Sequence, residues 1–198
     1  MVDEYIQLVK DNPYALSLIG EQTDEICLAA VSTKGRALEY VDKQTPEICM
    51  AAVCQEGEAL RYVKEQTPAL CLAAVQQDGL ALRHVRKQTA KLRMAAVQQN
   101  GFAVYFAEKQ SVELCMAAVK QNGLSLMGVK NQTDKMCLAA VKQNGLVLEF
   151  VKKQTPEICE AAIAQNPRAE KFVREQSSPA AGALMETTVV AVASANAV

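Results

Sequence analysis

The sequence predicts an all-α protein, an α-solenoid of short two-helix repeats. The first observation is a Gln followed by Thr or Ser that recurs every 22 residues. The second is that each interval carries two helical segments, with a Gly between them in six of the seven intervals. The third is an apolar run without alternation. A fixed period of this length is typical of a solenoid in which each repeat contacts only its neighbours. The recurring residues are Gln22, Gln44, Gln66, Gln88, Gln110, Gln132, Gln154 and Gln176.

The period divides the 198 residues into three parts. Residues 1–21 read as a diverged first unit, because the pair Asn12-Pro13 matches Asn166-Pro167 in the last repeat. Residues 22–175 form seven complete repeats. Residues 176–198 lie outside the pattern, and we expect this tail to form a capping helix.

Each repeat begins with the signals of a helix N-terminus. The hydroxyl after the Gln, such as that of Thr45, is placed to accept a hydrogen bond from a backbone N–H of the first turn. Pro46 follows where a missing N–H costs nothing, and Glu47 complements the helix dipole. The apolar run from Ile48 to Val53 then predicts a helix that neighbouring repeats cover on several sides.

A Gly after the apolar run in six of the seven complete repeats predicts the end of this first helix, because Gly is the usual left-handed residue at a helix C-terminus. A second helix is expected through Ala37, Leu38, Tyr40 and Val41 and their equivalents. Asn-Gly also occurs in β-hairpins, but the run is rich in Ala and does not alternate, so strands are rejected. These glycines are Gly35, Gly57, Gly79, Gly101, Gly123 and Gly145.

The last complete repeat departs from the others at two apolar positions. Glu160 stands where the earlier repeats carry Leu or Met, and Glu170 stands where the preceding repeat has Leu148. Charge at a buried position is expected in a capping repeat, whose outer face meets water.

Composition argues against catalysis and against nucleic acid as the main ligand. The formal net charge is -1, whereas a nucleic-acid-binding domain is usually strongly basic. The one His, His84, occupies an aromatic position, and there is no HExxH or CxxC motif. We therefore expect no metal, no cofactor and no enzymatic activity. Aromatic residues make up 5% with no Trp, which leaves few platforms for stacking bases.

Six of the seven Cys recur at one repeat position. Equivalent atoms of adjacent repeats should lie about 8–10 Å apart, which is too far for a disulfide or a shared zinc ion. We expect reduced, small apolar core residues, with Cys54, outside this series, more exposed. The series is Cys27, Cys49, Cys71, Cys115, Cys137 and Cys159.

The two ends of the chain bear on location. Asp3 and Glu4 stand where a signal peptide would be basic. Residues 179–198 have the length of a membrane span but contain Glu186 and several other polar residues. We therefore expect a cytoplasmic protein without a membrane segment, and a homo-oligomer formed through the tail is left open.

The strings QTPEICMAAV (residues 44–53) and GEALRYVKEQT (residues 57–67) resemble a tandem 22-residue helical-repeat family known only as a domain of unknown function. The resemblance covers residues 1 to about 175 and does not include the tail. The family occurs in bacteria, viruses and some eukaryotes, often within effector-like proteins. The resemblance implies helical repeats and, by analogy, interaction with a host or competitor protein after delivery into a host cell; it supplies no catalytic residues.

Two Gln series are expected to be structural. Buried polar groups need hydrogen-bond partners, so these side chains should bond turn backbone groups of their own or the next repeat. The alternative is that these Gln side chains bind a ligand. The first series is the one named above, and the second is Gln55, Gln77, Gln99, Gln121, Gln143 and Gln165.

A basic cluster spans one repeat boundary, and in it Arg93 replaces the recurring Cys. One interpretation is a site for an anionic patch on a partner protein or for phosphate, and the other is a solvated face. Nucleic acid is the weaker partner, because no Gly-rich phosphate loop or interleaved aromatic residues accompany the cluster. Its members are Arg83, His84, Arg86, Lys87, Lys91 and Arg93.

The central repeats carry apolar residues at positions where the outer repeats carry charge. Phe102 and Leu124 follow the turn Gly, where Arg36 and Glu58 stand earlier. Tyr105 and Met127 occupy another usually charged position. Gly128 stands at a position that is aromatic in most repeats, between Phe106 and Phe150 of the adjacent repeats. Repeat drift is the alternative, with Met127 filling the gap, but the departures cluster between residues 83 and 131. Clustered apolar residues favour a protein-binding site.

These observations predict a non-catalytic protein–protein interaction module that acts as a scaffold or as an inhibitor by occlusion. One alternative is an effector or anti-defence protein that binds a host or immune protein. The other is a nucleic-acid-binding solenoid that uses the basic patch. The partner-binding candidates are Arg83, Arg86, Lys87, Lys91, Arg93, Phe102, Tyr105, Leu124, Met127 and Gly128.

Overall fold

A computed structural model describes residues 2–174, which form helices and no strands, and this confirms the predicted all-α fold. The α-helix of each repeat begins at the predicted cap. Thr45 Oγ1 accepts a hydrogen bond from Ile48 N–H at 3.3 Å, and Pro46 is the first helical residue. The equivalent Thr or Ser caps the α-helix in each of the other complete repeats.

The second element of each repeat is a six-residue 3₁₀-helix. After the α-helix that ends at Gln55, the N–H of Glu56 bonds Ala52 O at 2.9 Å. The Glu56 carbonyl then accepts from Ala59 N–H at 2.8 Å, which starts the shorter i to i+3 pattern. Short segments of this length are where 3₁₀-helices are common.

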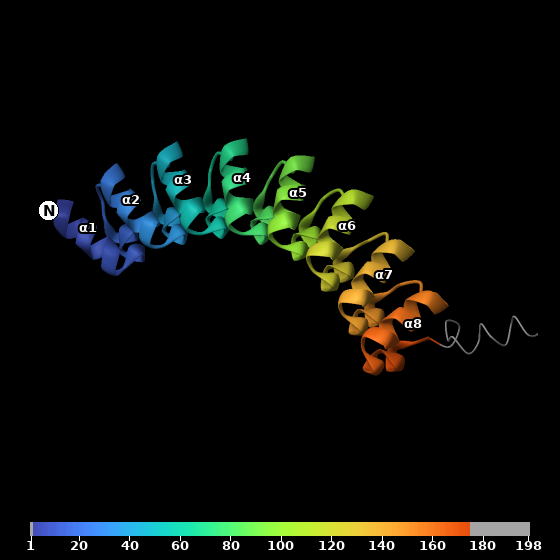
Figure 1. Cartoon of the computed structure of the whole chain (residues 1–198). Coiled ribbons are helices and arrows are strands. Elements are labelled where there is room, and N and C mark those ends of the chain that lie inside the picture. The colour runs from blue at the N-terminus through green and yellow to red at the C-terminus, as the bar shows by residue number, and fades with distance from the viewer. Residues whose placement is uncertain (1, 175–198) are drawn as a thin grey trace, which may run out of the picture. The chain divides into compact units, whose positions relative to one another are not determined.

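The described residues divide into two compact units, one ending at Gln110 and one beginning at Ser111. In the first unit, α-helices and 3₁₀-helices alternate and each lies beside its equivalent in the next repeat (Figure 1, blue to green). The order is α1 (Val2–Asp11), η1 (Pro13–Leu18), α2 (Asp24–Thr33), η2 (Gly35–Tyr40), α3 (Pro46–Gln55), η3 (Gly57–Tyr62), α4 (Pro68–Gln77), η4 (Gly79–His84), α5 (Ala90–Gln99) and η5 (Gly101–Phe106).

The second unit repeats the same pairing of elements. Its order is α6 (Val112–Gln121), η6 (Gly123–Gly128), α7 (Asp134–Gln143), η7 (Gly145–Phe150), α8 (Pro156–Gln165) and η8 (Pro167–Phe172). Within this unit too, each α-helix and each 3₁₀-helix contacts its equivalent in the adjacent repeat. Both units therefore have the architecture of an α-solenoid, as predicted.

The core of each unit runs between successive repeats. Ala52 and Val53 of α3 and Leu60 of η3 are fully buried. The small Ala side chain at this position allows adjacent α-helices to approach closely, while the larger residues fill the space between α-helix and 3₁₀-helix.

The predicted role of the turn Gly is wrong. No residue of the described part of the chain has a positive φ. α2 ends at Thr33, and Lys34, the residue that follows it, is extended with a φ of -145°. Gly35 instead begins η2 and lies against the next repeat, where a Cβ on it would come within 2.5 Å of Ala52 O. Gly is needed here for close backbone approach between repeats.

The first Gln series bonds backbone groups on both sides, as predicted. Gln44 Nε2 donates to Leu38 O at 3.4 Å and to Tyr62 O at 2.9 Å, while Gln44 Oε1 accepts from Lys64 N–H at 2.9 Å. One side chain thereby joins the 3₁₀-helix before it to the end of the 3₁₀-helix after it. The equivalent bonds form around Gln22, Gln66, Gln88, Gln132 and Gln154.

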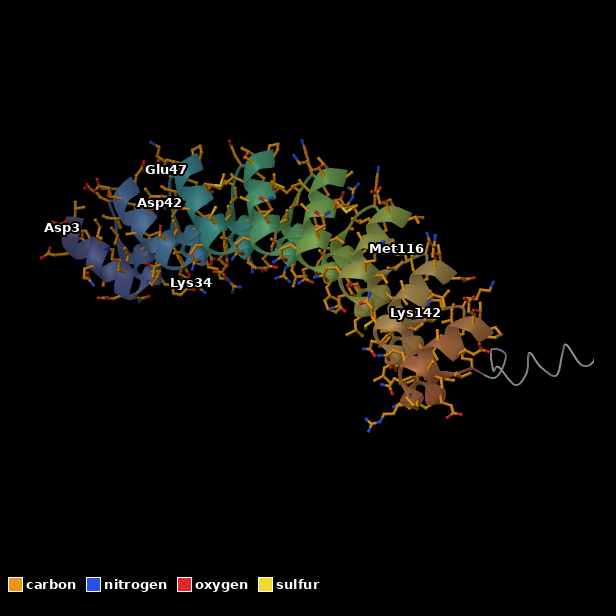
Figure 2. All side chains as sticks on the ribbon, viewed as in Figure 1. Asp3, Lys34, Asp42, Glu47, Met116 and Lys142 are labelled. Carbon is orange, nitrogen blue, oxygen red and sulfur yellow. The ribbon has the colours of Figure 1, made fainter. Side chains whose placement is uncertain are left out.

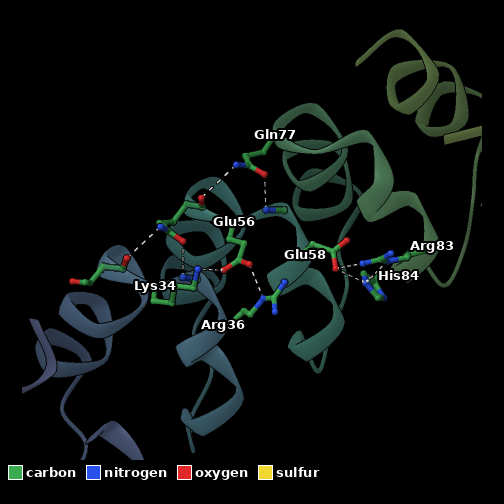
Figure 3. Close-up of polar contacts among 11 residues, drawn as sticks. Lys34, Arg36, Glu56, Glu58, Gln77, Arg83 and His84 are labelled. Carbon is green, nitrogen blue, oxygen red and sulfur yellow. Dashed lines mark hydrogen bonds and ion pairs between the residues drawn. The ribbon is translucent and has the colours of Figure 1, made fainter. Parts of the chain in front are cut away.

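The second Gln series is also structural. Gln77 Oε1 accepts from Gly57 N–H at 2.7 Å, and Gln77 Nε2 donates to Gln55 O at 3.4 Å (Figure 3). Pro13 occupies the Gly position of the first unit and has no N–H to donate. In the repeat that follows it, Thr33 takes the place of the Gln and donates to Ala29 O at 2.9 Å. The backbone N–H donor is therefore missing at the same junction at which the Gln side chain that would accept its hydrogen bond is missing.

The recurring Cys are buried and Cys54 is exposed, which confirms both predictions. Burial raises the pKa of the buried thiols, in the case of Cys137 to about 11 with a smaller contribution from Asp134. The thiol of Cys49 lies 3.7 Å from Gln44 Oε1 and so has a weak acceptor as well as apolar neighbours.

The last complete repeat carries charge at two positions that are apolar in earlier repeats. Glu160 and Glu170 are exposed, as expected for a capping repeat. The predicted capping helix at residues 176–198, and any oligomer formed through it, lie outside the described residues. Among residues 2–174, no helix combines the length and the apolar character that crossing a membrane requires.

Candidate functional site

The ten candidate residues are divided between the two units, and each set is described within its own unit. The second unit contains Leu124, Met127 and Gly128. The first unit contains Arg83, Arg86, Lys87, Lys91, Arg93, Phe102 and Tyr105.

Arg83 of η4 forms an ion pair with Glu58 of η3 in the preceding repeat (Figure 3). His84 Nε2 lies 3.3 Å from the same carboxylate oxygen and 3.1 Å from Arg83 Nε. Glu58 is only 9% exposed. The three side chains therefore form one charged cluster that joins η3 to η4.

The cluster fixes the ionisation of Glu58. Burial acts to raise its pKa, but the hydrogen bonds and positive charges of Arg83 and His84 outweigh burial and hold the pKa below its ordinary value. The carboxylate is thus ionised at neutral pH, and it holds Arg83 in place through a charge-assisted hydrogen bond.

Arg83 also faces aromatic residues of the next repeat. Its Cζ atom lies 5.9 Å from the ring centre of Phe106, within the range of a cation–π contact. On the same 3₁₀-helix, Phe102 stacks on Tyr105 with ring centres 6.3 Å apart. Tyr105 is 44% exposed and Phe106 is 37% exposed. We call Arg83, Phe102, Tyr105 and Phe106 the aromatic–arginine surface.

Three other candidate cations, Arg86, Lys87 and Lys91, line a pocket of about 690 Å³ at the first turns of α4 and α5. Arg86 is positioned by the chain, since its Nη1 donates to Lys64 O at 2.8 Å and its Nη2 donates to Val63 O at 3.1 Å. We call this the cationic pocket.

Arg93 belongs to neither group. It replaces the recurring Cys, is half-buried, and donates from Nη1 to Gln88 O at 2.7 Å. The basic cluster expected from the sequence is therefore distributed: Arg83 bonds Glu58, Arg93 bonds the backbone, and three cations surround a pocket.

In the second unit, the three candidates lie on η6. Met127 is 44% exposed, whereas Leu124 and Gly128 are half-buried. Met127 is thus the apolar side chain of this set that is most open to contact.

Two residues of the aromatic–arginine surface and its support were not among the candidates. They are Phe106, which belongs to that surface, and Glu58, which holds Arg83 in position. The available signal for Glu58 was its spacing of 25 and 26 residues from Arg83 and His84, which is one period plus three or four residues. At this pair of repeats the offset brings the opposite charges of Glu58 and Arg83 together.

Comparison with known proteins identifies one similarity. Residues 23–67 match the model of a family described as "Domain of unknown function (DUF4116)". The matched segment spans α2, η2, α3 and η3, which are two repeats of the solenoid. The chain matches no curated protein and no solved structure.

Proposed function

We propose that the chain is a non-catalytic protein–protein interaction module, acting as a scaffold or as an inhibitor by occlusion. The observation that carries this proposal is the aromatic–arginine surface. Tyr105 and Phe106 are partly exposed, and the Phe106 ring lies 5.9 Å from Arg83, which Glu58 holds in position. Tyr, Phe and Arg are enriched in interface cores, Tyr and Arg are frequent at hot spots, and side chains positioned in advance lose less entropy on binding.

Two kinds of chemical group that often act in catalysis, the imidazole of His84 and the recurring thiols, have structural surroundings in the described residues. His84 contacts Glu58 and Arg83. The recurring thiols are buried, and burial raises their pKa, so they stay protonated at neutral pH. The solenoid itself favours binding, because each repeat contacts only its neighbours and leaves a long surface open.

A nucleic-acid-binding solenoid ranks second. Of its five proposed cations, Arg83 is paired with Glu58 and Arg93 donates to Gln88 O. The remaining three line a pocket and do not follow an extended stripe. A partner from a host cell or an immune system is a narrower version of the interaction proposal, and its support is the resemblance alone.

The proposal is tested by affinity capture from the source cell or its host, followed by measurement of affinity for the purified partner. Tyr105→Ala should weaken binding by about tenfold or more, the effect of losing a hot-spot residue. Tyr5→Ala is the matched control, because Tyr5 is 41% exposed and lies in the same unit on α1.

Circular dichroism should give the same helical signal for both variants. A partner bound equally by wild type, Tyr105→Ala and Tyr5→Ala would overturn the assignment to this surface. A chain that binds duplex DNA or RNA with steep salt dependence, and captures no protein, would favour the second candidate.

A further inference from the structure

The cationic pocket lies away from the aromatic–arginine surface, at the other end of the α-helices. In Figure 2, Glu47 in the first turn of α3 lies at the upper edge of the first unit, and Lys34 at the end of α2 lies at its lower edge. The pocket is lined by first-turn residues of α4 and α5. Arg83 and Tyr105 belong instead to the 3₁₀-helices that follow the ends of those helices.

The charge around the pocket has one sign. Arg86, Lys87 and Lys91 line it, and none of its lining residues is Asp or Glu. Within residues 2–174, the side chains of Lys87 and Lys91 contact no hydrogen-bond or ion-pair partner of the chain. Three cations around one opening repel each other, so a negatively charged ligand is favoured there.

The wall of the pocket is apolar. Pro68, Ala69 and Leu72 contribute from α4, and Leu92 contributes from α5. A volume of about 690 Å³ accommodates more than one side chain. A small inorganic anion would satisfy the cations but would leave this wall in contact with water. The fitting ligand therefore combines negative charge with apolar groups.

The equivalent place one repeat earlier provides an internal comparison. The pocket at the first turns of α3 and α4 has a volume of about 230 Å³ and is lined by Lys64 and Glu65, whose charges cancel. Glu65 stands at the position of Lys87, and Glu47 stands at the position of Ala69. The change from Glu65 to Lys87 makes the charge of the cationic pocket positive, and the pocket is also the larger of the two.

We propose that the cationic pocket binds an acidic peptide segment of a partner protein. An apolar side chain of the segment occupies the space between Pro68, Leu72 and Leu92. Carboxylates on either side of it pair with Lys87, Lys91 and the fixed Arg86. This inference rests on the proposed function in one respect, that the ligand is protein, but it uses a separate surface.

The test is fluorescence anisotropy with the full chain and a labelled peptide in which a central Leu-Phe pair is flanked by glutamates. Binding is expected, and Lys87→Glu with Lys91→Glu should weaken it by about tenfold or more, because each reversal replaces an attraction by a repulsion. Lys120→Glu with Lys142→Glu is the matched control, since it makes the same charge change on exposed lysines of α6 and α7.

A second pair of variants separates charge from shape. Ala69 is exposed, so substitution there leaves the core intact. Ala69→Glu copies the acid that Glu47 supplies one repeat earlier and should weaken binding several-fold, about 2- to 5-fold for one rim charge. Ala69→Gln has the same shape without the charge and should bind more tightly than Ala69→Glu.

Three results would overturn the inference: no binding of the Leu-Phe peptide, equal binding by the Lys87 and Lys91 double variant, or equal binding of an all-glutamate peptide of the same length. Displacement of the labelled peptide by duplex DNA but not by the same peptide without the label would also overturn it, in favour of a nucleic-acid site. Tyr105→Ala should bind the peptide normally. Loss of peptide binding in the Lys variants, with partner capture unchanged, therefore distinguishes this site from the one under the proposed function.

Discussion

A Cβ atom on Gly57 would lie 2.5 Å from the carbonyl oxygen of Ala74 in the next repeat. The Gly57 N–H also donates to Gln77 Oε1 at 2.7 Å. The backbone of η3 is thus held directly against α4, with no room for a side chain between them. Gly79 and Gly145 have the same relationship to Ala96 and Ala162.

Gly57→Ala is therefore expected to destabilise the fold. The added methyl group overlaps a backbone atom that cannot rotate away, and overpacking of this kind costs about 1–3 kcal/mol. Urea unfolding followed by circular dichroism measures the effect. Gly20→Ala is the control, because a Cβ on Gly20 has no neighbour within 4 Å. Equal stability of the two variants would show that the repeats can separate without cost.

Gln66 is expected to be at least as sensitive to substitution as Gly57. Its Nε2 donates to Leu60 O at 3.3 Å and His84 O at 2.8 Å, and its Oε1 accepts from Arg86 N–H at 3.0 Å. Gln66→Ala leaves these backbone groups without partners and should cost about 2–4 kcal/mol.

Two further variants test that explanation of Gln66. Gln66→Glu keeps the shape but loses both N–H donors, so it should also be less stable than wild type. Gln76→Ala removes an exposed Gln of the same repeat and should change stability by less than about 0.5 kcal/mol. A loss of equal size in Gln76→Ala would mean that the hydrogen bonds of Gln66 do not set the cost.

The Glu58 cluster predicts a pH dependence. The folded-state pKa of Glu58 lies below its ordinary value of 4.5, so the ionised carboxylate stabilises the fold. This contribution is fully present above pH 4.5 and is lost as the pH falls through the lowered pKa. Glu58→Gln should be less stable than wild type by about 1–3 kcal/mol at pH 7, and the difference should shrink below pH 4.5.

Unfolding in urea at several pH values measures this difference. The exposed Glu65 offers a control, since Glu65→Gln should change stability little across the same range. A difference between wild type and Glu58→Gln that stays constant down to the most acidic condition would contradict a lowered pKa for Glu58.

The parts of the fold that were predictable from sequence are those set by local chemistry and period. A Thr before a helix, such as Thr45, identifies its cap because the hydrogen bond joins residues three apart. The burial of Cys49 and its equivalents follows from recurrence inside an apolar run. The second helix was located correctly, but its 3₁₀ form depends on which carbonyl each N–H reaches.

The role of Gly35 could not be deduced locally, because the atom that excludes a side chain belongs to the next repeat. The same holds for the candidate site. The sequence places Arg83, Arg86 and Arg93 in one cluster, but their partners are Glu58, two carbonyls of the previous repeat and Gln88. Residue type indicates which side chains carry charge, whereas contacts between repeats decide which of those side chains are free to bind a partner.

The Gln and Gly contacts have a consequence for how such a chain changes in evolution. A repeat of 22 residues corresponds to 66 nucleotides of coding sequence. An in-frame duplication or deletion of that segment brings the same pairs of positions together at the new junction as at the old one. The contacts between repeats are therefore kept when the number of repeats changes, whereas a substitution at one of these Gln or Gly positions removes them.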